Sequence, residues 1–342
     1  MLRLATWNVE WFSALFDRHG RLLDDHQWSG RHDVTRSQQI AALGRVFRAI
    51  DADAVMVIEA PDGSARREGG RALENFARHF GLRARRALLG FVNDTRQEIA
   101  LLYDSDRMTA RHDPQGPPTA RRDDTRAPRF DGTFRWDLDV DAAPERIRFS
   151  KPPLEVALET ATGARLRLIG VHAKSKAPHG ARSPKEALRI AIDNRRKQLA
   201  QCIWIRRRVD EVLAAGDPLI VLGDFNDGPG LDEYERLFGR SGVEIVLGGK
   251  GEIPLFDPHA EMVLKRRTGP WPSTARFYLK AERRYFTALL DYIMVSPDLR
   301  SRARRWRIWH PFDDPECFAD ESLRMALLAA SDHFPVVLEL DP

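Results

Sequence analysis

Short apolar runs that end in acidic, amide or imidazole side chains are the feature that most limits how this 342-residue chain can fold. Each run has the length and the β-branched or aromatic composition of a buried strand. Five runs share this form: Ala5–Glu10, Val57–Glu59, Gly170–His172, Val221–Asp227 and Ser331–His333. A sixth run, Leu290–Ile293, carries its acid near the beginning. Polar side chains repeated at strand ends predict a rigid site at a sheet edge.

Amphipathic helical patterns separate these runs, at 37–50, 70–80 and 184–214. Because strands and helices interleave while hairpin-like pairs also occur, the pattern predicts a mixed α/β fold and not a plain parallel repeat. We expect a single domain over residues 1–342, since the polar motifs are spread from residue 8 to residue 333. Two stretches, near 104–148 and 248–284, lack clear periodicity and are expected to be irregular surface insertions.

The charge of the chain is mildly basic and unevenly distributed. Its 54 basic and 50 acidic residues give a formal net charge of +4. Arginines gather around residues 83–86, 206–208 and 302–307. Each cluster alone is typical of a solvated face, whereas several on one chain suit a polyanionic partner.

Cysteine usage and hydropathy indicate a cytoplasmic protein. Cys202 and Cys317 are far apart and fit neither a zinc site nor a disulfide framework, which agrees with a reducing compartment. No run reaches the ~18 apolar residues of a membrane helix. The first strand pattern already begins at Leu2, which leaves no room for an export signal.

The residue types at the strand ends suit a hard cation such as Mg²⁺, which prefers carboxylate, amide and water oxygens over sulfur. Taken singly, each motif has a structural explanation. Asn8 could be a turn residue, Glu59 an acid at a helix N-terminus, and the Gly223–Asn226 segment a hairpin turn. Their joint occurrence in this order favours an active site.

The order of the motifs resembles the endonuclease/exonuclease/phosphatase superfamily, which includes pancreatic-type deoxyribonucleases, over essentially the whole chain. The resemblance is carried by W-N in the first strand, a lone Glu after the second, G-D-F-N, a late D-Y-I and the final S-D-H. It implies a four-layer α/β sandwich, in which two mixed β-sheets pack face to face with helices outside. The site is then expected at one edge, where loops of both sheets converge.

The resemblance also implies a set of metal ligands. Glu59 would be the main Mg²⁺ ligand, assisted by Asn8 and Glu10, and Mn²⁺ could replace Mg²⁺. Asp332 would approach the metal from the other side.

The catalytic residues follow from the same resemblance. Asp224 and Asn226 would hold the attacking water and a phosphate oxygen. His333 would act as general base or as an electrostatic clamp on the phosphate, and Asp291 would accept its other ring proton to fix the tautomer. His172 matches the second histidine of the deoxyribonuclease and sphingomyelinase branches, where it helps to protonate the leaving oxygen or to bind the phosphate.

Two further cations are substrate-binding candidates. Lys174 stands just past the strand that ends in His172, and a solvated loop lysine is the alternative reading. Arg96 precedes the stretch where relatives place an acid that orients the His172-type histidine. The alternation of side chains along the strand could place Gln97 at this position in place of Glu98. The sequence therefore does not identify the acid that orients His172.

We expect a magnesium-dependent phosphodiesterase, with a nuclease acting on DNA or RNA as the first hypothesis. The arginine clusters and the aromatic residues Trp271, Phe277, Tyr285 and Phe286 before the D-Y-I motif support nucleic acid as the substrate. The alternative is an enzyme for a small nucleotide, sugar or lipid phosphate. A binding scaffold is disfavoured because every core catalytic position is filled. No membrane and no obligate protein partner are inferred.

Overall fold

Two β-sheets form the centre of the computed structural model, which describes residues 1–64, 67–118, 126–136, 145–178, 180–229, 239–265, 271–279 and 283–341. The six-stranded sheet has the order β14 (Ala303–Ile308), β15 (Val336–Leu340), β1 (Leu2–Asn8), β2 (Ala54–Ala60), β4 (Glu98–Tyr103), β3 (Arg86–Leu89). The five-stranded sheet has the order β13 (Asp291–Val295), β10 (Leu219–Asp224), β9 (Arg165–His172), β8 (Leu154–Thr160), β5 (Met108–His112). Both sheets are mixed, since β1 pairs parallel with β2 and β10 parallel with β9.

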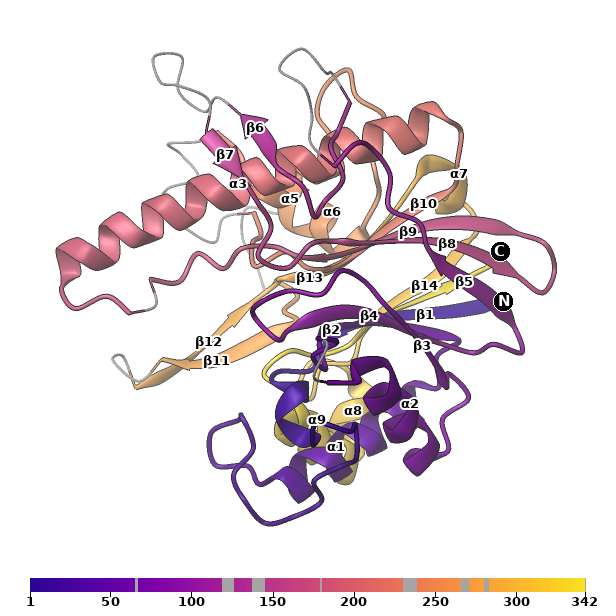
Figure 1. Cartoon of the computed structure of the whole chain (residues 1–342), viewed down its shortest axis with the longest axis vertical. Coiled ribbons are helices and arrows are strands. Elements are labelled where there is room, and N and C mark those ends of the chain that lie inside the picture. Colours follow the sequence, from indigo (N-terminus) through magenta and orange to yellow (C-terminus); the bar gives the residue numbers. More distant parts are fainter. Residues whose placement is uncertain are drawn as a thin grey trace.

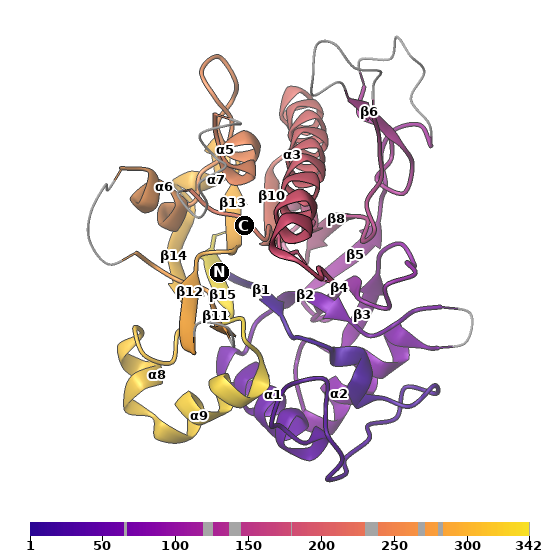
Figure 2. The ribbon, with the colours of Figure 1, turned by 90° about the vertical axis from the view of Figure 1, so that its left-hand side faces the viewer.

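Helices cover the outer face of each sheet (Figures 1 and 2). The six-stranded sheet packs on η1 (Phe12–Leu15), α1 (Arg36–Ile50), α2 (Gly69–Phe80), α8 (Pro315–Ala319) and α9 (Glu321–Ala330). The five-stranded sheet packs on α3 (Pro184–Ala214), α5 (Gly242–Leu247) and α6 (Pro258–Lys265), and the short α7 (Pro297–Arg300) follows β13. The four-layer sandwich expected from the resemblance is confirmed.

Strand alternation builds three apolar layers. In β1, Leu2 and Leu4 point between the two sheets, whereas Ala5 and Trp7 point toward the helices. Because side chains on a strand alternate between faces, each buried strand contributes to one core on each side. The layer between the sheets fixes how they face each other.

The helices begin where the sequence predicts. Ser183 caps α3 by accepting a hydrogen bond from the N–H of Glu186, and Pro184 opens the helix. Among the described residues, every helix is either too short or too polar to cross a membrane.

The expected insertions are more regular than their composition suggests. The stretch 104–148, described in part, adds β5 to a sheet and contains a small hairpin of β6 (Phe134–Trp136) and β7 (Glu145–Ile147). The stretch 248–284 contains α6 and leads into the hairpin of β11 (Ala275–Leu279) and β12 (Arg284–Ala288). Phe277 pairs with Phe286 across that hairpin, so cross-strand contacts order a segment whose periodicity is weak.

Gly223 permits the close approach of β10 to β9. Its φ is +138°, and a β-carbon there would lie 2.0 Å from the carbonyl oxygen of Val171. We expect Gly223→Ala to lower the free energy of unfolding by roughly 2–6 kcal/mol, through backbone strain and overpacking. Urea denaturation measures this change.

The matched control is Gly216→Ala. Gly216 has a φ of +78° with no heavy atom within 4 Å of an added β-carbon. Gly216→Ala should lower the free energy of unfolding through backbone strain alone, by roughly 1–2 kcal/mol. Equal losses in the two variants would contradict the close-approach argument.

Candidate active site

The alternation of side chains along each strand brings the predicted site residues to one place. In β10, Ile220 and Leu222 point between the sheets, and Asp224, two residues further on, has the same orientation. His172 follows Leu168 in β9 with the same parity, and Asn8 follows Leu4 in β1. These side chains therefore converge where the apolar layer between the sheets ends, at the edge viewed in Figure 2.

Asp224 accepts several of the hydrogen bonds at this edge. Its Oδ2 accepts hydrogen bonds from the side-chain amides of Asn8 (3.1 Å) and Asn226 (3.2 Å). The backbone N–H of Asn226 donates to Oδ1 at 2.7 Å. Burial raises the pKa of Asp224 to about 6, and the charge of His333 opposes this rise. Asp224 thus connects β1 with the loop that follows β10.

His333 and Asp291 form the predicted pair. The distance from His333 Nδ1 to Asp291 Oδ2 is 2.8 Å, and both side chains are buried. Thr274 Oγ1 accepts the backbone N–H of Asp291 at 2.9 Å, which holds the strand start in place. Burial disfavours a cationic ring, yet the carboxylates of Asp291 and Asp224 raise the pKa of His333 well above its usual value. The raised pKa favours a protonated ring in the metal-free site, which is the form that the clamp role requires.

Glu59 reaches the site through a local irregularity. Its parity in β2 would turn it toward the helices, but the register with β4 shifts between Ile58 and Ala60, and Glu59 has a φ of 60°. A bulge of this kind re-aims a side chain. Glu59 Oε2 accepts hydrogen bonds from Gln97 Nε2 (2.8 Å) and from the backbone N–H of Trp11 (3.0 Å).

Gln97, and not Glu98, faces the site. Gln97 shares the parity of Ile99, which lies between the sheets. Glu98 is buried on the other side, where it accepts a hydrogen bond from Asn93 Nδ2 (2.7 Å), and burial raises its pKa to about 7. Strand parity thus turns Gln97 toward the site, where it bonds to Glu59, and its predicted role in orienting His172 stays a prediction.

Lys151 is the partner of His172, and sequence reasoning missed it. Lys151 Nζ lies 3.2 Å from His172 Nε2, which itself lies 3.6 Å from Asp224 Oδ2. Burial, with help from the charges of Lys151 and His333, lowers the pKa of His172 well below its usual value, so the ring is neutral. Burial also lowers the pKa of Lys151, although the charges of Glu59 and Asp224 act in the opposite direction.

Glu10 and Asp332 bring two acids together. The backbone N–H of Asp332 donates to Glu10 Oε2 at 3.0 Å, and Arg31 forms an ion pair with the same carboxylate. Burial raises the pKa of Glu10 to about 7, and the charge of Asp332 adds to the effect while Arg31 opposes it. Arg31 is a second residue that the sequence interpretation missed.

One group at this edge, Asp224, Asp291 and His333, offers ligand atoms within 4.8 Å of one another and could hold a hard divalent cation. The predicted ligands Glu59, Asn8, Glu10 and Asp332 are connected in part, since the backbone N–H of Glu10 donates to Asn8 and that of Asp332 donates to Glu10. Their binding of a metal stays a prediction. The buried Oδ1 of Asp291 has no hydrogen-bond partner among the described residues, which leaves it available as a ligand.

The two predicted substrate-binding cations differ in placement. Lys174 is half-buried beside the site, with its backbone N–H bonded to Gln201, and burial lowers its pKa. Arg96 is exposed one residue before Gln97 and has a φ of 59°. Lys176 is bonded to the buried Asp227, which gives it a structural role.

The clustered arginines form many ion pairs within the fold. Arg83 pairs with Asp51 and Asp53, Arg206 with Asp210, Arg208 with Glu155 and Glu211, Arg304 with Asp341, and Arg307 with Asp314 and Glu316. These carboxylates balance much of the positive charge, and substrate binding by the clusters stays a prediction.

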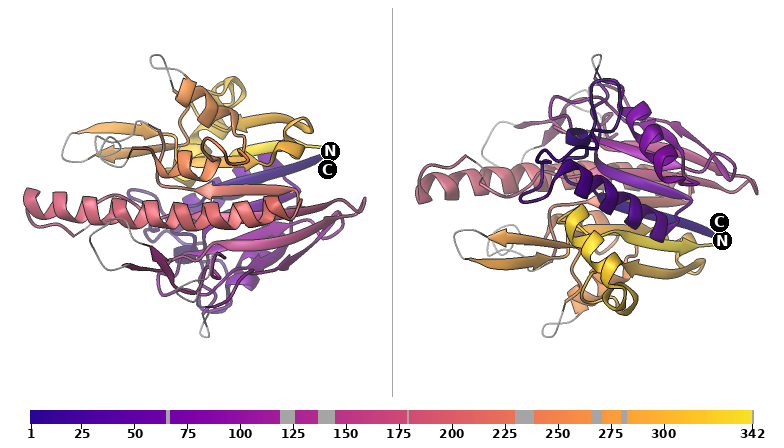
Figure 3. Two further views of the ribbon diagram at one scale, coloured as in Figure 1. Left: turned by 90° about the horizontal axis from the view of Figure 1, so that it is seen from above. Right: turned by 90° about the horizontal axis from the view of Figure 1, so that it is seen from below.

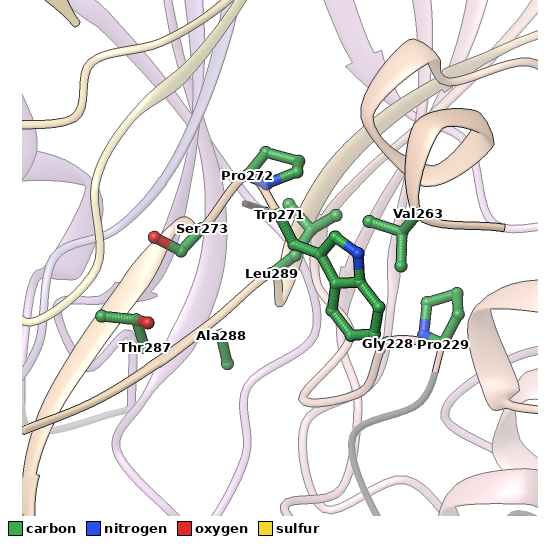
Figure 4. Close-up of a pocket in the computed structure, with 9 residues that line it drawn as sticks. All are labelled: Gly228, Pro229, Val263, Trp271, Pro272, Ser273, Thr287, Ala288 and Leu289. Carbon is green, nitrogen blue, oxygen red and sulfur yellow. The ribbon is translucent and has the colours of Figure 1, made fainter. Parts of the chain in front are cut away.

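A cavity of about 220 Å³ adjoins the site (Figure 4). Its lining includes Gly228, shortly after Asp224, and Leu289, shortly before Asp291. Trp271 and Thr287 also line it. Of the aromatics singled out in the sequence, Trp271 lines this cavity, and Phe277 contacts His333 with ring centroids 5.5 Å apart.

The fold and the site together define a phosphoesterase of the sandwich type. The sequence matches the Endonuclease/Exonuclease/phosphatase family over residues 5–333. The chain belongs to this family. It is a metal-dependent phosphoesterase, with the buried Asp224, Asp291 and His333 as one potential metal site.

Solved structures of low sequence identity share the fold. A 3'-5' exonuclease (NExo) from Neisseria meningitidis is 18% identical, with a TM-score of 0.51 and 100% of both chains covered. An AP endonuclease from Archaeoglobus fulgidus is 13% identical, with a TM-score of 0.52 and the same coverage of 100% for both chains. The 3' phosphatase NExo from Neisseria, bound to a product DNA hairpin, is 17% identical, with a TM-score of 0.51 and 100% coverage of both chains. Comparison with curated proteins finds no match.

The pairing of Asp291 with His333 can be tested by titration. Since the carboxylate raises the pKa of His333, we expect Asp291→Asn to lower that pKa, so that the ring loses its proton at a lower pH. NMR of the histidine ring in the metal-free protein measures the shift, with His333→Gln to assign the signal. An unchanged titration in Asp291→Asn would contradict the pairing.

Proposed function

We propose that this phosphoesterase is a nuclease that hydrolyses phosphodiester bonds of DNA or RNA. The observation that carries the proposal is the group of cations around Asp224. Lys151 lies close enough to Asp224, Glu59 and Lys174 for their charges to affect its pKa. A single phosphate at Asp224 would use Lys151 and His333, which leaves Lys174 for a neighbouring phosphate.

The surroundings of the site agree with a long substrate. The β11–β12 hairpin and the first turns of α3 project in the same direction beyond the strand ends (Figures 1 and 3). The first turn of α3 carries the exposed Lys185. Two matched structures bear nuclease names, and a third was solved with a DNA hairpin, which supports the same substrate class.

The residues of the site have different roles in the hydrolysis. Asp224 and Asn226 orient the attacking water, because the buried carboxylate can accept a hydrogen bond from it. The His333 ring, held by Asp291, stabilises negative charge on the phosphate. Lys151, next to His172, stabilises the same charge.

Glu59, Asn8, Glu10 and Asp332 would hold the divalent cation. When bound, the cation supplies Lewis-acid stabilisation of charge on the phosphoryl oxygens. Gln97 and the Trp11 backbone N–H fix the Glu59 carboxylate for this purpose.

The salt dependence of substrate affinity separates a nuclease from an enzyme for small phosphate esters. Each bound phosphate releases counterions. The slope of the logarithm of the observed affinity against the logarithm of the salt concentration should therefore be roughly −0.7 to −0.9 per contact. We expect a slope that corresponds to about three or more contacts for single- or double-stranded oligonucleotides. Fluorescence anisotropy with Ca²⁺ in place of Mg²⁺ measures it.

Substitutions then identify the contacts. Lys151→Gln and Lys174→Gln should each reduce the slope by about one contact. Arg304→Gln is the matched control, since Arg304 is paired with Asp341, and its slope should equal that of the wild type. A flat salt response, with faster hydrolysis of a mononucleotide or sugar phosphate than of any polymer, would favour the alternative function.

A further inference from the structure

Trp11 combines an exposed side chain with a contact to the site and an unusual backbone conformation. Its side chain is 49% exposed. Its backbone N–H donates to Glu59 Oε2 at 3.0 Å, so the indole begins at the residue that positions the main metal-ligand candidate. Its backbone is left-handed, with φ 60° and ψ 34°, a region that bulky side chains rarely adopt.

The unusual backbone is concentrated at this point. Glu10 has a φ of 45°, Trp11 of 60° and Glu59 of 60°. Residues held in such conformations cluster at functional sites, where the surrounding structure fixes them. Here two of the three residues are predicted metal ligands, and Trp11 is the third, with no metal-binding atom of its own.

The ring is held in place on one side. A β-carbon on Gly30 would lie 2.4 Å from the β-carbon of Trp11, so only glycine lets this loop pack so closely. The loop is tied down by Arg31, which pairs with Glu10 and donates to the carbonyl oxygen of Leu328 at 3.0 Å. A fixed, half-exposed indole is a pre-organised surface for a planar ligand.

We propose that Trp11 stacks on the nucleobase next to the scissile phosphate. The inference rests on the proposed function, because Trp11 begins at Glu59, the predicted ligand of the cation that would bind the scissile phosphate. The charged pair of Glu10 and Arg31 beside the ring disfavours a lipid tail, whereas a base has an apolar face and a polar edge. Stacking on tryptophan accepts any base, so Trp11 confers a preference for base-bearing substrates without reading sequence.

Glycine and phenylalanine substitutions separate the ring from the backbone. Trp11→Gly keeps the N–H to Glu59 and suits a φ of 60°, but removes the ring. Trp11→Phe keeps an aromatic surface. Trp28→Gly is the matched control, because Trp28 lies in the same loop region and is 67% exposed.

The readout is the ratio of kcat/KM for an oligonucleotide to kcat/KM for the same oligonucleotide with abasic residues flanking the cleaved bond. In Trp11→Gly this ratio should fall by roughly five- to a hundredfold, the range for loss of one stacking ring. Trp11→Phe should retain most of the ratio, and Trp28→Gly all of it. A ratio in Trp11→Gly equal to that of the wild type would overturn the inference while leaving the nuclease proposal intact.

A second pair of substrates covers the case in which polymers are not cleaved. If the wild type hydrolyses nucleoside monophosphates only, the nuclease proposal fails, and the same ratio is taken for a nucleotide against its base-free sugar phosphate. A drop confined to Trp11→Gly then supports stacking on a free nucleotide. No drop, or hydrolysis of base-free esters alone, overturns the inference.

Discussion

The apolar layer between the two sheets is the constraint on which the site depends. Leu4, Ile220 and Ile293 pack in this layer, one from each of three strands. The polar residues that lie an even number of positions away on the same strands point in the same direction. Because alternation on a strand is strict, burying these side chains commits Asn8 and Asp224 to the same edge. The catalytic geometry is therefore a consequence of core packing.

The convergence of acids and cations sets the chemistry of this edge. Asp224 is shared among side-chain amides and lies near both histidines, so its charge is balanced from several directions. The pKa values of His333 and His172 shift in opposite directions. His333 is paired with Asp291 and its pKa rises, whereas His172 faces Lys151 and its pKa falls. Within the same cluster, His333 therefore holds a proton more readily than His172.

Periodicity predicts a mixed α/β fold, and the family resemblance carried by the order of the motifs predicts the sandwich and most of the site. The helix at Pro184–Ala214 and the strand-end acids needed no three-dimensional information. Lys151 could not be found this way, since it becomes a neighbour of His172 only through the antiparallel register of β8 and β9, in which Leu154 pairs with Gly170. The ion pairs of the arginine clusters could be foreseen only in part, since Arg206 pairs with Asp210 one helical turn away, whereas Arg83 pairs with Asp53 across the fold.

The dependence of phosphodiester hydrolysis on Mg²⁺ in the wild type and in Glu59→Gln tests the central claim most directly. The amide of glutamine keeps the shape of Glu59 but removes the charge that a hard cation requires. The wild type should saturate with Mg²⁺ and lose all turnover reversibly on chelation. Glu59→Gln should retain the fold by circular dichroism and lose turnover at every Mg²⁺ concentration that saturates the wild type. Full hydrolysis in excess chelator, or an unchanged Mg²⁺ titration in Glu59→Gln, would contradict a metal-dependent site at this edge.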